Sequence, residues 1–356
     1  MKQWTVERAN EWYKKQPWLV GCNYLPGNAV NQLEMWQAET YDPQRIDLEL
    51  GWAESLGFNA LRVYLHDLCW RDDESGFCSR IDDFLGIAER HGMKVLFVLF
   101  DDCHRPDPVS GVQLLPVAGV HNCGWAQSPG AAIRMQFHEG TVAESEKIRL
   151  QKYIQGVLRR FSGDERILMW DIYNEAGQFG PGDTSNELLT LTWQWAQEVR
   201  PSQPLTACLD GAVGEKNLAI NQAKSDVITF HCYGGKDIEA SIIRHKAVAG
   251  RPAICTEYMA REAGTIFQLC LPLFKEHHVG CFCWGLVAGK SQTHFNWKTM
   301  ATLEECKAQG LFLKLSDPIP EPELWFHDIF RMDGSPFDQK EVDFIRSMVH
   351  SPCCGF

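Results

Sequence analysis

Eight short apolar runs recur along this chain of 356 residues, and each has the length of one buried strand. They cover residues 19–24, 60–65, 94–100, 167–172, 205–208, 227–231, 253–256 and 280–284. Their apolar residues are continuous rather than alternating, which is typical of strands that are buried on both faces of a parallel sheet. A chain with eight such strands must therefore cover both faces of the sheet that they form.

Helical patterns between these runs supply that cover. Apolar residues recur at helical spacing in four stripes, which are Ile46, Leu50, Ala53 and Leu56; Ile81, Phe84, Leu85 and Ala88; Ile154, Val157, Leu158 and Phe161; and Ile266, Leu269, Cys270 and Leu273. The helix after the fifth run is the least distinct. This alternation predicts an α/β fold, a single (β/α)8 TIM barrel that forms one domain over residues 1–356. The alternative is a doubly wound open sheet, but no glycine-rich phosphate loop follows the first run.

The charge and the apolar pattern exclude two classes of partner. The formal net charge is -12 and no basic cluster stands out, which argues against nucleic acid. Residues 1–7 contain no stretch of signal-peptide length, and no run approaches the ~18 apolar residues of a membrane span. We therefore expect a cytoplasmic protein without a membrane partner. The sequence leaves the oligomeric state open.

The cysteines predict neither disulfides nor a metal site. Fourteen cysteines in a cytoplasmic chain are expected to be small, reduced core residues. Cys281 and Cys283 alternate on one predicted strand, and Cys353 and Cys354 are adjacent near residue 356. Neither pair has the spacing of a zinc site. We expect no metal and no cofactor.

Two glutamates follow directly on predicted strands. Glu175 comes after Asn174 at the end of the fourth run, and Glu257 comes just after the seventh. The strand ends of a parallel barrel form one rim, where barrel enzymes hold their active sites. Glycoside hydrolysis needs two carboxyl groups, one as acid/base and the other as nucleophile or base. The two glutamates are therefore the candidate catalytic residues.

Other polar and aromatic side chains fall at the same rim. Arg62 lies inside the second apolar run, where an arginine needs a carboxylate partner. His104 follows the third run, His231 and Tyr233 end the sixth, and Trp284 ends the eighth. We expect these side chains to surround the two glutamates.

Three connections at this rim are long, at about residues 26–42, 101–144 and 285–320. Loops beyond ~12–15 residues in a compact domain are usually lids or binding loops. These loops carry Trp36, His121, Asn122, Trp125, His294 and Trp297. They are expected to wall the site into a pocket, which favours removal of a terminal sugar over cleavage within a polymer. For the tryptophans and His121, a role in packing is as consistent with the sequence as a role in binding.

The rim residues Arg62, His104, Asn174, Glu175, His231, Tyr233, Glu257 and Trp284, in this order, resemble the pattern of glycoside hydrolase family 5 over nearly the whole chain. The resemblance implies that Glu175 is the acid/base and must begin protonated. It implies that Glu257 is the nucleophile and stays ionised, which Arg62 and Tyr233 would promote by charge and hydrogen bonding. A retaining mechanism would follow, with the two carboxyl groups about 5–5.5 Å apart.

The same resemblance assigns roles to the remaining rim residues. Asn174 would bind the sugar 2-hydroxyl, and Trp284 would form the floor under the reacting ring. His104 and His231 would line the pocket. The segments at residues 16–23, 31–36 and 120–125 resemble subfamily 18 of the family, which adds Trp36, Asn122 and Trp125 to the expected binding residues. That resemblance implies an intracellular exo-β-mannosidase that acts on mannose β-1,4-linked to N-acetylglucosamine, a small oligosaccharide.

Three alternatives stay open at this point. The first is a family 5 enzyme that acts as a β-glucosidase, cellulase or mannanase. The second is a metal hydrolase on the same barrel, although the first run ends in Cys22, Asn23 and Tyr24 without a histidine, and no His-Glu-x-x-His motif occurs. The third is an inactive sugar-binding barrel, although such a chain should have lost Arg62 or one glutamate.

Overall fold

The eight expected strands form one parallel sheet in the computed structural model, which describes residues 3–310 and 321–351. The sheet order is β5-β4-β3-β2-β1-β8-β7-β6. Its strands are β1 (Val20–Asn23), β2 (Ala60–Tyr64), β3 (Lys94–Val98), β4 (Ile167–Asp171), β5 (Leu205–Thr206), β6 (Ile228–Cys232), β7 (Ala253–Tyr258) and β8 (Gly280–Trp284). Part of the third long connection, residues 311–320, and the adjacent Cys353 and Cys354 lie outside the described residues.

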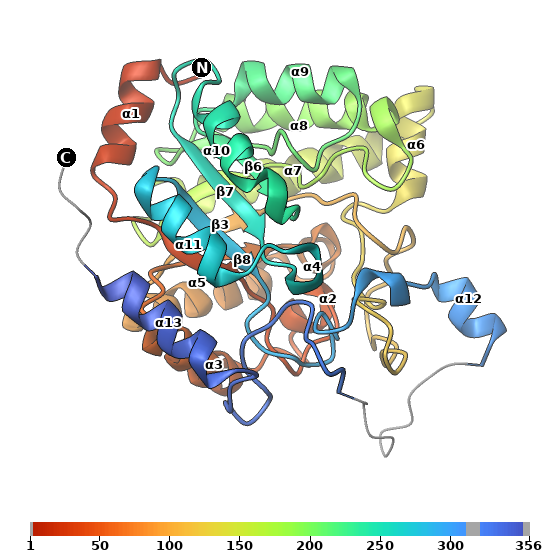
Figure 1. The fold of residues 1–356 in the computed structure, drawn as a ribbon. Helices are drawn as coiled ribbons and strands as arrows, with labels where there is room; N and C mark the ends of the chain where they lie inside the picture. Colours follow the sequence, from red (N-terminus) through yellow and green to blue (C-terminus); the bar gives the residue numbers. More distant parts are fainter. Residues whose placement is uncertain (1–2, 311–320, 352–356) are drawn as a thin grey trace.

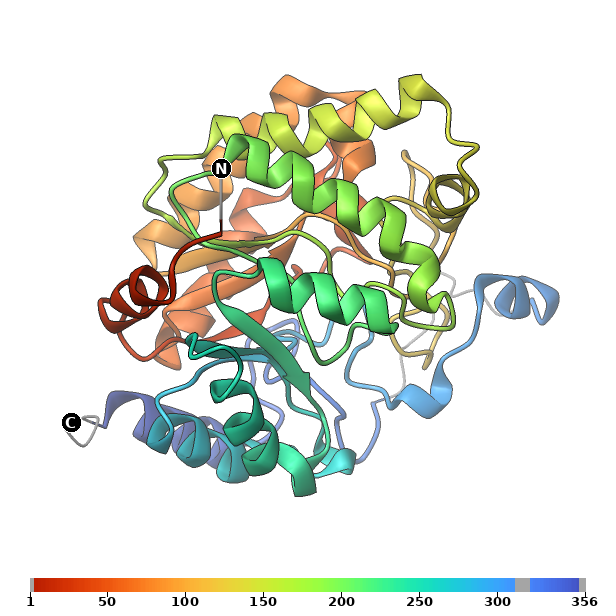
Figure 2. The same ribbon diagram turned by 90° about the horizontal axis from the view of Figure 1, so that it is seen from above.

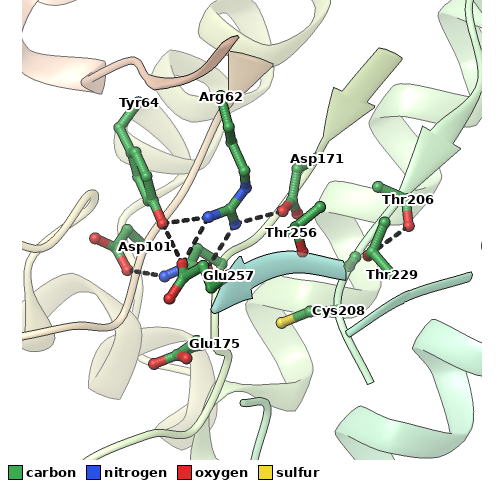
Figure 3. Close-up of polar contacts among 12 residues, drawn as sticks. Arg62, Tyr64, Asp101, Asp171, Glu175, Thr206, Cys208, Thr229, Thr256 and Glu257 are labelled. Carbon is green, nitrogen blue, oxygen red and sulfur yellow. Dashed lines mark hydrogen bonds and ion pairs between the residues drawn. The ribbon is translucent and has the colours of Figure 1, made fainter. Parts of the chain in front are cut away.

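The sheet closes into a barrel, so the prediction of a (β/α)8 fold is confirmed and the open-sheet alternative is wrong. Strand β1 pairs in parallel with both β2 and β8, which joins the first strand to the last. Strands β5 and β6 are bridged by single contacts. The backbone N–H of Leu209 donates to the carbonyl of Thr229 at 2.8 Å. The hydroxyls of Thr206 and Thr229 lie 2.9 Å apart across the same seam (Figure 3).

Helices surround the barrel on its outer side (Figures 1 and 2). Those nearest the strands in sequence are α3 (Pro43–Ser55), α5 (Glu74–Arg90), α7 (Glu144–Arg160), α8 (Asn186–Val199), α9 (Glu215–Lys224), α10 (Ile238–Lys246), α11 (Phe267–Glu276) and α13 (Gln339–His350). Shorter helices lie in the connections, namely α2 (Gln32–Trp36), α4 (Asp67–Asp72), α6 (Ala131–Glu139) and α12 (Leu303–Ala308). No described helix combines the length and the apolar character that crossing a membrane requires.

The first helix, α1 (Val6–Lys14), covers the amino-terminal end of the barrel, and the sequence pattern did not predict it. Thr5 caps the helix by accepting a hydrogen bond from the backbone of Arg8. Trp12 and Tyr13 pack against the apolar cluster inside the barrel. The Tyr13 hydroxyl accepts a hydrogen bond of 2.7 Å from the backbone of Gly280, where β8 begins. The end of the barrel opposite the carboxyl rim is therefore covered by side chains.

The core has an inner and an outer part. Inside the barrel lies a cluster that comprises Leu19, Ala60, Tyr64, Leu96, Val98, Cys103, Trp125, Leu168, Met169, Val227, Ile254 and Phe282. The larger outer cluster fills the space between strands and helices. It contains the expected stripes of α3, α5 and α7, whose residues are all buried.

The predicted face of α11 is correct only in part: Cys270 is buried and Leu273 packs partly buried against the core, but Ile266 and Leu269 are not buried. Phe267, Cys270, Leu271 and Phe274 are buried in this helix, whereas Leu269 is 39% exposed and Ile266 is the N-cap residue. The segment is apolar on most of its circumference, so helical spacing alone did not distinguish the face that packs against the barrel. The contacts with β8 and with helices α10 and α13 decide it.

Candidate active site

The two glutamates reach the same rim from opposite sides of the barrel. Glu257 is a residue of β7 itself, and Glu175 lies four residues after the end of β4. The backbone of Glu175 has a φ of +46°, a left-handed conformation that residues other than glycine adopt at a cost. The backbone N–H of Asn174 donates to the carbonyl of Phe100 at 2.7 Å, which ties this turn to the end of the neighbouring strand.

Glu257 is surrounded by hydrogen-bond donors. Arg62 and Tyr64 donate to its Oε1 at 2.6 Å and 2.7 Å (Figure 3). Tyr233 donates to its Oε2 at 2.7 Å. Burial by itself would raise the pKa of this carboxyl group. The charges of His231 and Arg62 and the two phenol hydrogen bonds outweigh burial, and the pKa lies below its ordinary value. Glu257 is therefore held as a carboxylate.

Arg62 is fully buried and holds the site together. Its guanidinium also donates to Asp171 at 2.7 Å, to the amide oxygen of Asn174 at 2.8 Å and to Asn23 at 2.9 Å. These contacts join residues of β1, β2, β4 and β7 through one side chain. Burial would lower the pKa of Arg62, but the negative groups around it raise the pKa well above the ordinary value. The expectation of a carboxylate partner in this apolar strand is met twice, by Asp171 and Glu257.

Glu175 has different partners and more access to solvent. Its Oε1 lies 2.7 Å from Nδ1 of His231, and its Oε2 accepts a hydrogen bond of 3.0 Å from the Cys103 thiol. The Glu175 side chain is 12% exposed, against 5% for Glu257. His231 also lies 3.5 Å from Glu257, so it stands between the two carboxyl groups. Burial would lower the pKa of His231, but the two glutamates outweigh burial and raise it.

The two carboxyl groups face each other at short range. One oxygen of Glu175, one of Glu257 and a ring nitrogen of His231 all lie within 4.8 Å of one another. Among the described residues this is the one group with the spacing of a metal site. Both oxygens of each carboxylate already accept hydrogen bonds, and the Arg62 guanidinium contributes a positive charge at 2.6 Å. The donor set therefore suits a hydrogen-bonded pair of carboxyl groups better than a bound cation.

Both the amide oxygen and the amide nitrogen of Asn174 make hydrogen bonds within the site. Its oxygen accepts from Arg62, and one N–H donates to Asp101 at 2.8 Å. The second N–H has only a long contact of 3.5 Å with the Cys103 sulfur, so it is available to a hydroxyl group. Asp101 also accepts a hydrogen bond of 2.6 Å from the indole of Trp125. Burial raises the pKa of Asp101 to about 7, although its hydrogen bonds act in the opposite direction.

A cavity of about 250 Å3 opens above the two glutamates. Its lining includes the predicted residues His104, Asn122, Trp125, Asn174, Glu175, Tyr233, Glu257 and Trp284. Arg62 and His231 are not part of the lining, and act through the glutamates that they contact. His121 and Trp297, from the long loops, also line the cavity.

Two of the loop residues lie elsewhere. Trp36 is fully buried in the outer core, where its ring packs against Phe77 and Phe84 and its indole donates to the carbonyl of Tyr64 at 2.8 Å. The prediction that Trp36 binds substrate is therefore wrong, because the short helix α2 folds it back onto the barrel wall. His294 lines a separate surface hollow beside Trp325.

Tyr64, Cys103 and His327 are site residues that the sequence did not single out. Tyr64 is two residues after Arg62 on β2, so strand alternation places both side chains on the same face, and this signal was available. Cys103 is next to His104 in the sequence, and only His104 was predicted to line the pocket. His327 lines the cavity from the segment before α13, and its ring packs 5.8 Å from that of Tyr233. No local pattern marks this contact.

The loops after β3 and β8 are joined into one wall of the cavity. The backbone of Asn122 donates to the carbonyl of Ser291 at 2.9 Å, and the backbone of His121 donates to the Thr299 hydroxyl at 2.9 Å. The His121 ring lies 2.7 Å from the carbonyl of Phe295. Residues about 170 to 180 positions apart in the sequence thus fix one another, and together they form one wall of the cavity.

Among known proteins, only solved structures match this chain, and they support its fold. No family model and no curated protein matches this chain. The exo-β-1,4-mannosidase of Opitutaceae bacterium strain TAV5 aligns with a TM-score of 0.60 and 17% identity, over 93% of this chain and 58% of that chain. This chain therefore spans little more than half of that enzyme's length.

Two further structures align over more of their own length. A GH5_18 variant from Streptomyces cattleya, in complex with Manβ1-4GlcNAc, has a TM-score of 0.60 and 13% identity, over 94% of this chain and 82% of that one. The endo-β-1,4-mannanase of Thermotoga petrophila has a TM-score of 0.58 and 15% identity, over 95% and 77%. Structural neighbours of this chain thus include glycoside hydrolases of family 5, and the chain has their barrel fold.

Proposed function

We propose that this protein is a retaining β-glycosidase, with Glu257 as nucleophile and Glu175 as acid/base. The observation that carries the proposal is the short separation of the two carboxyl groups, whose nearest oxygens lie within 4.8 Å. Retaining enzymes hold the pair about 5–5.5 Å apart, whereas inverting enzymes need about 6.5–9.5 Å to admit a water molecule. The unlike surroundings of the two glutamates support unlike roles.

In the first step, Glu257 attacks the anomeric carbon while Glu175 gives a proton to the leaving oxygen. Arg62, Tyr64 and Tyr233 keep Glu257 ionised and aimed before substrate binds. We assign the second N–H of Asn174 to the sugar 2-hydroxyl and the Trp284 ring, which lines the cavity, to the floor under the sugar. A covalent glycosyl-enzyme results.

In the second step, Glu175 takes a proton from water, which then attacks the anomeric carbon and releases Glu257. The contact of Glu175 with the His231 ring offers a route by which the carboxyl group exchanges its proton. The cavity open above Glu175 admits the water once the leaving group has departed. Two inversions give a product of the original anomeric configuration.

The test of this mechanism is the anomer formed first and the response of two variants. Proton NMR should show release of the β-anomer from a β-glycoside. Glu257→Ala should form no glycosyl-enzyme, and added azide should restore turnover with an inverted product. Glu175→Ala should mainly slow substrates with poor leaving groups, because an activated aryl group needs little protonation. First release of the α-anomer would refute retention, and the opposite response of the two variants would reverse the roles.

We further propose exo-action on a terminal β-mannoside, with mannosyl-β-1,4-N-acetylglucosamine as the preferred small oligosaccharide. The wall formed by the joined loops after β3 and β8 supports exo-action, because it turns a groove into a pocket. Neighbouring structures support the sugar, since one binds Manβ1-4GlcNAc and another is described as an exo-mannosidase. Trp125 and Trp297 line this pocket, and Trp36 does not contribute to it.

A substrate panel tests the specificity. Catalytic efficiency on mannosyl-β-1,4-N-acetylglucosamine should exceed that on mannobiose, cellobiose and soluble mannan. Faster release of internal fragments from mannan would contradict exo-action and favour a mannanase. A preference for cellobiose would leave the mechanism intact and replace the mannosidase by a β-glucosidase. Absence of turnover on every aryl β-glycoside would favour the inactive sugar-binding barrel, and loss of turnover after EDTA treatment would favour a metal hydrolase.

A further inference from the structure

A second cavity adjoins the one above the glutamates, and its volume is about 400 Å3. The two cavities share His104, His121, Asn122, Gln178, Phe179 and Met300. If the first cavity holds the sugar that is transferred, the second is where the leaving group lies. Its lining therefore determines which leaving groups the protein accepts.

Two arginines line this second cavity, and within the part of the chain that the structure describes only one of them has a carboxylate partner. Arg134, from α6, donates to Asp102 at 3.0 Å. Arg105 makes no side-chain hydrogen bond or ion pair with the residues that the structure describes, and its Nε is buried without a partner. An unpaired, half-buried arginine in a chain of net charge -12 is unusual, because charged groups out of water are normally paired.

Hydrogen bonds fix the backbone of Arg105 and the side chain of Arg134. The backbone N–H of Arg105 donates to the carbonyl of Trp125 at 3.1 Å, and its own carbonyl accepts from Gln127 at 2.9 Å. Arg134 is 5% exposed and is held through one nitrogen, Nη1, by Asp102 and Gln127. Its Nε is buried without a partner, and its Nη2 has no hydrogen bond among the described residues. The cavity therefore contains guanidinium donors that have no partner among residues 3–310 and 321–351.

The other ionisable side chains that line the cavity do not cancel this charge fully. Burial lowers the pKa of His104 to about 4 and that of His121 to about 3, so both are neutral near pH 7. Asp102 balances Arg134 but also accepts hydrogen bonds from the Tyr173 hydroxyl and the backbone of Gly177, so its charge is shared. Glu305, on α12, is fully exposed, and water screens its charge.

We propose that this cavity is the leaving-group subsite and that, besides the neutral N-acetylglucosamine of the substrate proposed above, it takes an alcohol or sugar that carries an anionic group, a carboxylate or a phosphate, bound by Arg105 and Arg134. This inference rests on the proposed function. Guanidinium groups bind carboxylates and phosphates through paired N–H donors, and such charge-assisted hydrogen bonds are stronger than those to neutral hydroxyls. Arg105 contributes the uncompensated charge, and Arg134 contributes its unused N–H groups.

The test compares two aryl β-glycosides of the sugar that the protein cleaves, one with a 4-carboxyphenyl and one with a 4-carbamoylphenyl leaving group. The wild-type protein should favour the carboxylate through a lower KM. Arg105→Gln should reduce that preference at least about tenfold, the size of one charge-assisted hydrogen bond. The preference is the ratio of the KM values for the two substrates, and it is compared between the wild-type protein and the variant. The intrinsic reactivity of each substrate is the same in both proteins, so a change in the ratio reports a change in binding.

Two further variants make the test specific. Arg160→Gln removes the same charge from the last residue of α7, where Arg160 lies over the Phe161 ring and does not line the cavity, and should leave the preference unchanged. Glu305→Gln keeps the capping box of α12 and removes a charge that water already screens, so the preference should also stay unchanged. An equal preference in wild-type protein and Arg105→Gln would overturn the proposal. Failure to cleave either substrate would instead refute the proposed function.

Product inhibition distinguishes the two anions. Glucuronate, glucose 6-phosphate and glucose are compared as inhibitors of the carbamoylphenyl substrate. Stronger inhibition by glucuronate assigns a carboxylate, and stronger inhibition by glucose 6-phosphate assigns a phosphate. Both effects should weaken in Arg105→Gln and at high salt. Equal, weak inhibition by all three compounds would contradict an anionic subsite.

Discussion

At the scale of single residues, the site depends on different hydrogen-bond partners for two chemically identical carboxyl groups, those of Glu175 and Glu257. Glu257 accepts from one arginine and two phenols, whereas Glu175 lies against an imidazole and a thiol. Hydrogen bonds to a charged form favour that form, and those from cations favour it most. The difference between the carboxyl groups therefore comes from their neighbours and not from their exposure alone.

Tyr64→Phe should reduce kcat/KM by roughly 10- to 100-fold, because a hydrogen bond to a charged group contributes about 1.5–3 kcal/mol. The Tyr64 hydroxyl is one of the groups that lower the pKa of Glu257. Its removal raises that pKa, so the acid limb of the kcat/KM profile should move to higher pH.

Tyr24→Phe is the matched control, since it removes a phenol that donates to the buried Glu49 at 2.9 Å, away from both glutamates of the site. The acid limb should not move in this variant. An unmoved limb in Tyr64→Phe, or an equal shift in both variants, would show that Tyr64 does not act on Glu257.

At the scale of elements, close approach between helices depends on small residues at the contact. Gly156 of α7 faces the ring of Trp70 in α4, and an added Cβ would lie 2.3 Å from that ring. Gly86 of α5 is also inside a helix, but an added Cβ there would meet nothing within 4 Å. Both glycines thus have a helical backbone, and they differ only in whether another side chain lies where a Cβ would be added.

Gly156→Ala should therefore destabilise the protein by about 1–3 kcal/mol, because overpacking exceeds the gain in helix propensity. Gly86→Ala should stabilise it by up to about 1 kcal/mol, because the propensity gain is not opposed. Urea unfolding measures both changes. Destabilisation of similar size in the two variants would mean that the contact with Trp70 is not the cause.

At the scale of the whole molecule, buried carboxyl groups link stability to pH. Asp328 is 1% exposed, accepts a hydrogen bond of 2.7 Å from Thr293, and has a second oxygen without a partner among the described residues. Burial raises its pKa to about 7. Between its ordinary pKa near 4 and this value, the folded protein keeps a proton that the unfolded chain has lost. The contribution of Asp328 to stability is thus present at low pH and is lost as pH rises towards 7.

Asp328→Asn should remove this part of the pH dependence. The variant should be more stable than the wild-type protein at pH 8 by about 1–4 kcal/mol, and the difference should shrink towards pH 4. Asparagine tolerates the left-handed backbone of this position, where φ is +56°. Free energies of unfolding at several pH values measure the effect. A constant difference across this range would show that Asp328 does not titrate in the folded protein.

The sequence by itself determined the barrel and the strand ends that carry the two glutamates. The run 60–65 is apolar on both faces apart from Arg62, so it forms a buried strand wherever the chain places it. Arg62 within that run required a buried carboxylate, and the parallel order of the strands brought Glu257 to it. Tyr64 could have been found by the same strand alternation.

Only the tertiary structure decided the surroundings of that pair. Whether a tryptophan of a rim loop lies in the pocket or in the core depends on contacts distant in the sequence, as Trp125 and Trp36 show. The wall of the pocket exists because residues near 120 bond to residues near 295, and no local pattern encodes that pairing. Strand position follows from short-range periodicity, whereas the direction of a loop side chain follows from packing between segments that meet only in the folded chain.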